Sequence, residues 1–398
     1  MSVKELSLRL RGLAAYRNIL RQPVTAALLR LLEAADAEAV CACRGELCHL
    51  LIKRGLLRSL PSAVAAEALE DDNPLTRAWA AGVKPDELLL SAAKIDLGTL
   101  FAAASLSPAD FRQNFPLPEW QNGSAPFPLD HPWNDALTAL AAWHRAHGHG
   151  IYAGHDAFYW DGHITPVATP DPIRLRELKG YGYQRDIAVD NTLAFINGGS
   201  ANNILFYGDR GTGKSSTVKA LLNEYKNHGL RMIEVPKARL PELPAVTARL
   251  AASPLRFILF IDDLSFSGND DSFAALKAVL EGGLSACPKN VLIYATSNRR
   301  HLLKETFSDR QGDEVHHADT VQEAVSLSDR FGITLTYLLP DKIHFLEIVE
   351  QLAADHGIMM DKQKLFLQAE QWAAERGGRS PRYARQFIAY LENKQEEK

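Results

Sequence analysis

The chain has 398 residues, of which 46% are apolar and 23% are charged, and its formal net charge is -4. This length exceeds what one ordinary core fills and predicts two or three domains, and the composition excludes a disordered or fibrous protein. The slightly acidic charge excludes a general attraction to nucleic acid or to an acidic membrane surface, although it leaves a local basic patch open.

The N-terminal segment MSVKELSLRLRGLAAYRNIL mixes charged and apolar residues at helical spacing and lacks the continuous apolar stretch of a secretory signal. No stretch of the chain approaches the roughly 18 consecutive apolar residues of a membrane-spanning helix. The four cysteines do not form the regular framework of a secreted, disulfide-bonded domain. We therefore expect a cytoplasmic protein that does not associate with a membrane.

Residues 1–106 show apolar residues at three-to-four-residue spacing, which predicts helices. Residues 107–132 are rich in Pro and aromatic residues and predict a connecting loop, and NDALTALAAWHRAHG predicts a further helix. The segment AFYWDGHITPV then predicts a tight hairpin with Asp161 and Gly162 in its turn. We place a mainly helical N-terminal domain, ending in this hairpin, at residues 1–165.

Two clusters in this region raise the question of a metal site. The cysteine spacing in CACRGELCH differs from a two-residue zinc knuckle, and the segment reads as an amphipathic helix in which Cys packs as a small apolar side chain. The histidines further along lack an acidic or Cys partner at a matching spacing. We favour core packing over metal binding for the first cluster, Cys41, Cys43, Cys48 and His49. We favour packed or solvated side chains over metal ligands for the second, His144, His147, His149 and His155.

Beyond the Pro-rich segment ATPDPI, predicted strands and helices alternate. Apolar runs predict five strands, at residues 203–207, 231–235, 257–261, 291–296 and 333–338. Because helical segments separate them, the pattern predicts an α/β fold with a five-stranded parallel sheet covered on both faces, at residues 166–340. Only helices are predicted from Asp341 onward, and these form a helical lid domain at residues 341–398.

The most specific motif follows the first of these strands. Residues 208–215, GDRGTGKS, match the pattern G-x-x-x-x-G-K-[ST] between a strand and a helix. The glycines let backbone N–H groups curl around phosphate oxygens, and the helix adds its positive N-terminal end. Lys214 is expected to reach the β- and γ-phosphates and Ser215 to bind Mg²⁺. The candidate nucleotide-binding residues are Gly208, Asp209, Arg210, Gly211, Thr212, Gly213, Lys214, Ser215 and Ser216.

A pair of carboxylates ends the third strand, in FILFIDDL. We expect Asp262 to hold Mg²⁺ together with Ser215, and Asp263 to orient the attacking water. Strand-end Asp residues often cap loops. Here, however, one strand separates the pair from the phosphate-binding loop, which favours the metal-binding interpretation.

Together these motifs resemble an AAA+ ATPase, and more narrowly the bacterial AAA+ family of predicted ATPases of unknown function. The resemblance runs from about Phe158 to the end, through LKGYGYQ, FIDDLSF, YATSNRRHL, SLSDRFG and GGRSPRYARQFI, and is thin before residue 150. It implies the phosphate-binding fold of that superfamily, the cofactors ATP and Mg²⁺, and ATP hydrolysis. It also implies a homo-oligomer, in a ring or spiral.

The resemblance further implies roles for individual residues. Asn298 matches the residue that positions the hydrolytic water, Arg330 matches the arginine finger offered to a neighbouring subunit, and Arg382 matches the lid residue that touches the phosphates. Tyr181 and Gly182 match the segment that lines the adenine pocket. An ordinary turn for Asn298 and a surface ion pair for Arg330 stay as alternatives. The catalytic candidates are Asp263, Asn298, Arg330 and Arg382.

Arginines recur every third residue from Arg376 to Arg385. We expect Arg382 to face the triphosphate and some of the other arginines to face solvent, because no interleaved aromatic residues support a surface for nucleic acid. Nucleic acid binding is therefore possible but unsupported.

Two positions depart from the AAA+ pattern. Asp263 stands where Glu is common, which makes slow turnover plausible, and Pro381 replaces the small residue expected before Arg382. Two functions follow. One is a machine that couples ATP hydrolysis to conformational change on a client bound by the N-terminal domain; the other is a slow nucleotide-gated switch whose N-terminal helices dock on a protein partner. A small-molecule kinase is disfavoured by the lid and by SLSDRFG.

Overall fold

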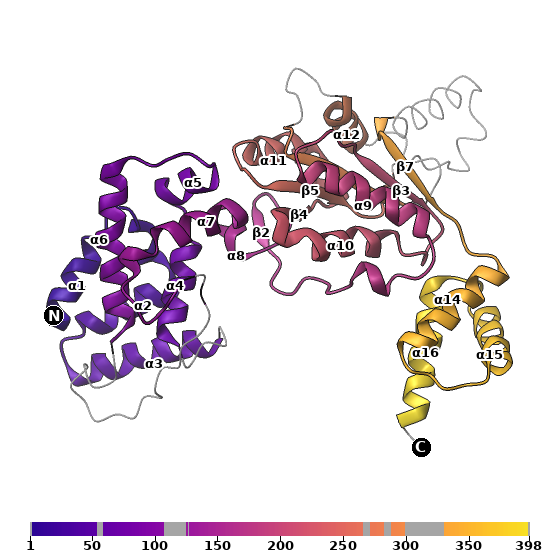
Figure 1. Cartoon of the computed structure of the whole chain (residues 1–398), viewed down its shortest axis with the longest axis horizontal. Coiled ribbons are helices and arrows are strands. Elements are labelled where there is room, and N and C mark those ends of the chain that lie inside the picture. Colours follow the sequence, from indigo (N-terminus) through magenta and orange to yellow (C-terminus); the bar gives the residue numbers. More distant parts are fainter. Residues whose placement is uncertain are drawn as a thin grey trace. The chain divides into compact units, whose positions relative to one another are not determined.

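The computed structural model describes residues 2–53, 59–106, 125, 127–265, 271–281, 288–298 and 330–396. They form two compact units, which are drawn in Figure 1. One unit comprises Met1–His155 with Ser253–Leu255, and the other comprises Asp156–Ala252 with Arg256–Lys398.

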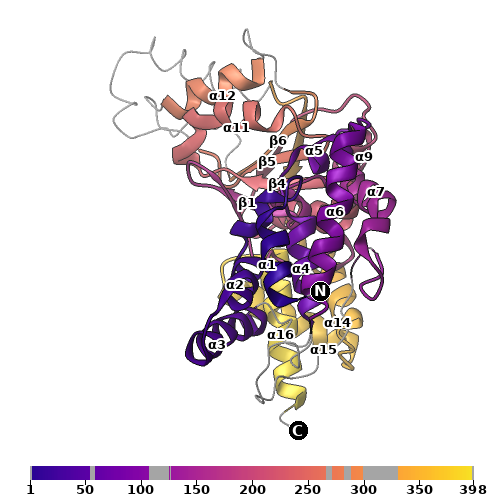
Figure 2. The ribbon, with the colours of Figure 1, turned by 90° about the vertical axis from the view of Figure 1, so that its left-hand side faces the viewer.

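The first unit is helical, as the apolar spacing predicts (Figure 2). Side chains from most of its helices meet in one apolar cluster, in which Leu28, Leu97 and Trp133 are fully buried. None of the described helices of the chain is long and apolar enough to cross a membrane. The helices are α1 (Val3–Arg11), α2 (Pro23–Glu33), α3 (Ala37–Lys53), α4 (Leu60–Leu69), α5 (Pro74–Ala80), α6 (Glu87–Ala104), α7 (Leu137–His147) and α8 (Ile151–Gly154), with 3-10 turns η1 (Arg17–Arg21) and η3 (Trp133–Asp135).

Local sequence explains how α5 begins. The Asn73 side chain accepts hydrogen bonds from the backbone N–H groups of Leu75 and Thr76, at 2.9 and 3.0 Å. The Thr76 hydroxyl accepts from the Asn73 backbone N–H in return, and Pro74 occupies the first helical position. This reciprocal cap satisfies donors that the first turn leaves unpaired.

Most of the predicted loop at 107–132 lies outside the described residues.

The candidate metal clusters have different surroundings. Cys41 is exposed on α3 and Cys43 and Cys48 are half-buried, so the expected packing of these cysteines as buried apolar side chains is wrong for Cys41. His144 is fully buried, its Nδ1 lies 2.8 Å from the Gly148 carbonyl, and burial lowers its pKa to about 4. Within the described ranges, no group of three or more His, Cys, Asp or Glu residues is arranged to hold a metal ion.

The second unit is built on a seven-stranded sheet with the order β2-β1-β4-β5-β6-β3-β7. The strands β3 to β7 pair in parallel, and each begins and ends within one residue of its predicted bounds. The predicted α/β fold with a five-stranded parallel sheet is therefore confirmed. The strands are β1 (Ala157–Trp160), β2 (Ile164–Pro166), β3 (Ile204–Gly208), β4 (Leu230–Glu234), β5 (Arg256–Ile261), β6 (Val291–Ser297) and β7 (Ile333–Tyr337).

The predicted hairpin forms from β1 and β2, with Trp160 opposite Ile164. It is also part of the sheet, because β1 pairs in parallel with β4 and places Phe158 beside Ile233. Phe158 and Trp160, on the same side of β1, are buried with 1% and 2% exposed. The turn residues specify a hairpin but do not indicate which edge of the sheet the hairpin joins. The hairpin thus extends the sheet, and the second unit begins at Asp156.

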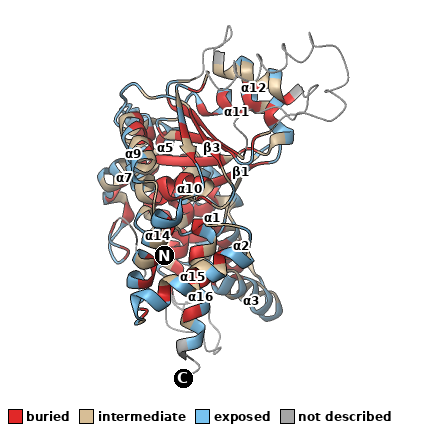
Figure 3. Ribbon diagram, turned by 90° about the vertical axis from the view of Figure 1, so that its right-hand side faces the viewer, coloured by how far each residue is buried: buried red, intermediate tan, exposed pale blue. Residues whose placement is uncertain are grey.

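Helices α9 (Gly182–Ile196) and α10 (Lys214–Tyr225) cover one face of the sheet, where Phe195 and Leu221 pack with Phe206 and Tyr294 (Figure 1). The strands are largely buried, as the red ribbon in Figure 3 shows. The remaining elements between β2 and β6 are α11 (Leu243–Leu250), α12 (Asp271–Glu281), η4 (Leu175–Glu177), η5 (Lys226–His228) and η6 (Lys237–Glu242).

The predicted C-terminal helices form as α14 (Lys342–Asp355), α15 (Lys362–Glu375) and α16 (Pro381–Glu396). They enclose an apolar cluster of their own that includes Phe345, Ala369 and Phe387. Asp side chains cap α14 and α15: Asp341 accepts from the N–H of His344 at 2.9 Å, and Asp361 caps α15. We refer to α14, α15 and α16 together as the lid.

Candidate functional site

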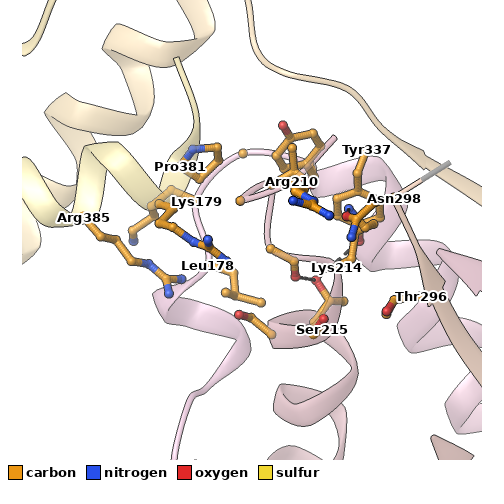
Figure 4. A pocket seen from close by; sticks show the side chains of 18 of the residues that line it. Leu178, Lys179, Arg210, Lys214, Ser215, Thr296, Asn298, Tyr337, Pro381 and Arg385 are labelled. Carbon is orange, nitrogen blue, oxygen red and sulfur yellow. Dashed lines mark hydrogen bonds between the residues drawn. The ribbon is translucent and has the colours of Figure 1, made fainter. Parts of the chain in front are cut away.

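A cavity of about 550 Å³ lies at the carboxyl ends of β3, β5, β6 and β7, the edge where parallel sheets bind ligands (Figure 4). Its walls come from the segment before α9, the loop between β3 and α10, the strand ends and the start of α16. The residues that line it are Leu178, Lys179, Gly180, Tyr181, Arg185, Arg210, Gly211, Thr212, Gly213, Lys214, Ser215, Ser216, Thr217, Asp262, Asp263, Thr296, Asn298, Tyr337, Pro381, Arg382, Arg385 and Gln386.

Two glycines explain the shape of the loop at residues 208–215. Gly208 has a φ of +133°, and a Cβ atom there would lie only 2.1 Å from the Tyr337 backbone oxygen. Glycine is therefore required where β3 and β7 approach each other. Gly213 has a φ of +97° with no atom within 4 Å of a Cβ position, so the backbone turn itself needs glycine before α10 starts.

Lys214 is the first residue of α10, and only 6% of its surface is exposed. Its ammonium donates hydrogen bonds to the carbonyls of Gly208 and Asp209, at 2.9 and 2.6 Å, and to Asn298 Oδ1 at 3.0 Å. Burial lowers the pKa of Lys214 to about 8, although the nearby Asp209, Asp263 and Asp262 oppose this shift. The loop thus holds a cation among neutral oxygen atoms, which a charged phosphate oxygen would outcompete.

The first of the two carboxylates after β5 bonds the phosphate-binding loop. Asp262 Oδ1 accepts hydrogen bonds from the hydroxyls of Ser215, at 2.6 Å, and Thr296, at 2.5 Å. The structure therefore brings Ser215 and Asp262 together, as the sequence motifs predict for a metal site. A hydroxyl and a carboxylate are oxygen donors of the kind that Mg²⁺ binds, so these two residues fit that ion.

Asp263 adopts a left-handed backbone conformation, with a φ of 51°, and its N–H donates to the Thr296 hydroxyl at 2.9 Å. Its Oδ1 accepts from the Asn298 amide at 2.6 Å. Because Asn298 also accepts from Lys214, it connects the phosphate-binding loop to the carboxylate. A non-glycine residue in this conformation is uncommon and is often found at functional sites.

Aromatic side chains form another part of the cavity wall. The rings of Tyr181 and Tyr337 are stacked, with centroids 4.9 Å apart, and the Tyr181 hydroxyl donates to the Leu338 carbonyl at 2.5 Å. Burial, reinforced by the charge of Asp209, raises the pKa of Tyr181. Gly182, the other predicted adenine contact, instead lines a neighbouring cavity of about 440 Å³.

The described lining contains six cationic side chains and only two carboxylates. Arg382 belongs to this set, and its backbone N–H donates to the Gly211 carbonyl at 3.1 Å, which joins the start of α16 to the loop. The excess positive charge suits a polyanionic ligand. The cations are Lys179, Arg185, Arg210, Lys214, Arg382 and Arg385.

Arg385 is a second arginine of the series that faces the cavity. It extends from α16 toward Leu178, lines the cavity and donates to the Glu177 carbonyl at 3.3 Å (Figure 4). Burial lowers the pKa of Arg385. Its spacing from Arg382 already places both on one helical face, a signal that could have identified it.

The other two arginines of the series pack against lid side chains. Arg376 lies over the Trp372 ring, with its guanidinium carbon 3.4 Å from the ring centroid. Arg379 donates two hydrogen bonds of 2.8 Å to the Glu370 carboxylate.

The remaining predicted residues lie as follows. The residues from Arg210 to Ser216 line the cavity, whereas Gly208 and Asp209 are not among the described residues that line it. The Asp209 carboxylate accepts from the Leu339 N–H at 2.7 Å. Arg330 comes shortly before β7 and is not among the described residues that line the cavity of its own chain. Residues 326–329 of SLSDRFG lie outside the described residues.

The lining residues that the sequence motifs did not predict include Lys179, Arg185, Thr296 and Tyr337. Thr296 and Tyr337 end strands whose positions were predicted, so their place at the carboxyl edge of the sheet was accessible from the strand pattern. Lys179 and Arg185 flank the GYGY segment without a recognisable spacing, and no sequence signal pointed to them.

Comparisons with known proteins assign the chain to a family. The family described as "Protein of unknown function (DUF815)" matches residues 153–395, and no curated protein matches the chain. Among solved structures, a variant of RuvB from Thermotoga maritima shares 17% identity over 56% of this chain and 63% of that chain, with a TM-score of 0.38. The FIGL-1 AAA domain in complex with ADP shares 16% identity over 56% of this chain and 73% of that chain, with a TM-score of 0.37. This chain thus spans less than two thirds of the RuvB chain, and the likeness concerns the fold.

Proposed function

Because the chain belongs to the DUF815 family and has an AAA+ ATPase-like fold, we propose that its second unit binds and hydrolyses ATP with Mg²⁺. One observation carries this proposal. Lys214, Ser215, Asp262, Asp263 and Asn298, from three separate segments, form neighbouring hydrogen-bonded groups within a strongly cationic cavity.

The loop and Lys214 would bind the phosphates. The backbone N–H groups at the start of α10 add the positive end of the helix, and Lys214 exchanges its neutral acceptors for charged phosphate oxygens. A cavity of about 550 Å³ falls within the usual range for a site that binds a small ligand or cofactor. The surplus of cations over carboxylates supports a triphosphate in particular.

Ser215 and Asp262 would hold Mg²⁺, which when bound neutralises charge on the β- and γ-phosphate oxygens. Asp263, held by the Asn298 amide, would orient a water molecule toward the γ-phosphorus. As the water oxygen bonds to phosphorus, the bond to the bridging oxygen breaks and ADP takes the electron pair. The water proton passes to the Asp263 carboxylate and then to solvent.

Assembly would complete the site. In this proposal Arg382 contacts the phosphates from the lid, and Arg330 reaches the γ-phosphate of a neighbouring subunit in a homo-oligomer. The position of Arg330 outside the lining of its own cavity supports a role in trans. The helical first unit would recruit a protein client, and hydrolysis would move the lid against the sheet.

A slow nucleotide-gated switch is the second candidate. Asp263 favours it, because its side chain is one methylene shorter than Glu and its Oδ1 is already held by Asn298. In this version ATP fixes one conformation of the second unit, and the first unit docks on a protein partner.

Phosphate release from ATP, measured on the full chain over a wide range of protein concentrations, tests both candidates. A specific activity that rises steeply with concentration supports the assembled machine. Tight ATP binding with slow release that does not depend on concentration supports the switch. A protein that does not bind ATP rejects both.

A further inference from the structure

Arg185 is a cation of the cavity whose hydrogen bonding is incomplete. It lies in the first turn of α9, where its backbone N–H donates to the Tyr181 carbonyl at 3.1 Å. Its Nη1 atom is buried and makes no hydrogen bond within the described part of the chain. By contrast, Lys179 pairs with Asp355 at 2.5 Å, and Arg385 donates to a carbonyl. A buried donor without a partner is costly, so it calls for an explanation.

The neighbours of Arg185 place it at the aromatic part of the cavity. Its backbone N–H bonds the Tyr181 carbonyl, and the adjacent Gln184 side chain donates to the Thr336 carbonyl at 2.9 Å, one residue before Tyr337. Tyr337 stacks on Tyr181, and both line the cavity. The arginine within the phosphate-binding loop itself is instead Arg210.

We propose that Arg185 reads the base of the bound nucleotide, donating a hydrogen bond from its guanidinium to one acceptor nitrogen of a purine ring. The inference rests on the proposed ATP binding and adds a specificity-determining residue to that site. A guanidinium has only donors, so its partner must be an acceptor. The two stacked tyrosines and Leu178 offer the flat apolar surface that an aromatic base requires.

The adenine ring carries acceptor nitrogens at positions 1, 3 and 7, which makes the test specific. Dissociation constants are measured for ATP, 1-deaza-ATP, 3-deaza-ATP, 7-deaza-ATP and inorganic tripolyphosphate. On the unaltered chain, one deaza analogue is expected to bind at least about tenfold more weakly than ATP, the loss typical of a hydrogen bond to a charged group. The other two analogues are expected to bind like ATP.

The variant Arg185→Met removes the donors and keeps an apolar side chain of similar length. It is expected to weaken ATP binding by the same factor, to abolish the difference between ATP and the sensitive analogue, and to weaken tripolyphosphate binding much less than ATP binding. The matched control is Lys364→Met, which removes an exposed cation on α15 outside the cavity and is expected to keep the full pattern.

Two results would overturn the inference while the proposed function stands. In one, all three deaza analogues bind the unaltered chain as tightly as ATP; in the other, Arg185→Met weakens tripolyphosphate as much as ATP, which assigns the guanidinium to the phosphates. Failure of the unaltered chain to bind ATP overturns the proposed function and this inference together. If Arg185→Met does not fold, as thermal unfolding would show, the analogue series on the unaltered chain decides.

Discussion

At the scale of single residues, the site depends on Lys214. It is nearly buried, and its ammonium has three neutral acceptors in place of a charged partner. These hydrogen bonds hold the ammonium beside the loop, where it can bind an anion. Lys214 was identified from a local pattern, because the fixed spacing of GDRGTGKS carries the geometry within eight residues.

Replacing Lys214 by Ala is expected to lower the affinity for ATP by at least about a hundredfold, because the variant loses a buried charge that faces the phosphates. Isothermal titration calorimetry measures this loss. The control is Lys364→Ala, which removes an exposed cation of the lid. Unchanged affinity in the Lys214 variant would contradict the assignment of the loop.

The lowered pKa of Lys214, about 8, predicts a pH dependence of ATP binding. Below pH 8 the ammonium is charged in the free protein, and the affinity is expected to be flat. Above pH 8 the free protein loses this proton and binding must restore it, so the affinity falls by up to about tenfold per pH unit. Titrations between pH 6.5 and 9.5 check this. A curve that stays flat to pH 9.5 would show that the lysine pKa is not lowered.

Replacing Asp263 by Asn is expected to leave ATP affinity within about threefold and to slow phosphate release by at least about a hundredfold, since an amide cannot accept the water proton. The control is Asp186→Asn, an exposed carboxylate on α9. If the Asp263 variant turns over at the unaltered rate, the water is oriented by another group.

At the scale of elements, the contact of β3 with β7 positions the loop. Gly208 lies opposite Tyr337, and the two backbones are too close for any side chain at residue 208. The strand patterns predicted each of these elements to within one residue. They could not predict that β3 lies between β6 and β7, or that β1 joins β4, because such pairings depend on residues far apart in the chain.

Replacing Gly208 by Ala is expected to lower the free energy of unfolding by more than about 2 kcal/mol, because the new Cβ meets a backbone oxygen and the φ of +133° is strained. Gly182→Ala is the control, since its Cβ position is open and its change is expected within about 0.5 kcal/mol. Urea unfolding compares the two. Equal stability of both variants would mean that the strands separate without cost.

At the scale of the whole molecule, the sequence located the phosphate-binding loop and the carboxylates but not the full cavity wall. Lys214, Asp262 and Asn298 follow or end predicted strands, so parallel-sheet geometry alone brings them together. Lys179 and Arg185 come from a segment whose position depends on how it packs against β7, and Arg385 depends on where α16 meets the loop. Such packing has no signature in residue spacing.

Assembly makes a further prediction. Arg330→Ala and Lys214→Ala are each expected to reduce phosphate release to near background, the first because a neighbour lacks its arginine and the second because ATP is not held. Mixing the two variants should restore part of the activity, since a chain with Lys214 can pair with a chain that carries Arg330. A mixture no more active than the sum of its parts would argue against action in trans.

Two hydrogen bonds hold the segment that links β7 to the lid. The Leu338 carbonyl accepts from Tyr181, and the Leu339 N–H donates to Asp209, beside the phosphate-binding loop. Backbone rotation at either residue would break one of these bonds, and Pro340 is the first residue beyond them. If the lid rotates, the hinge therefore lies beyond Leu339. The stacked tyrosines then stay with the sheet while the arginines of α16 move.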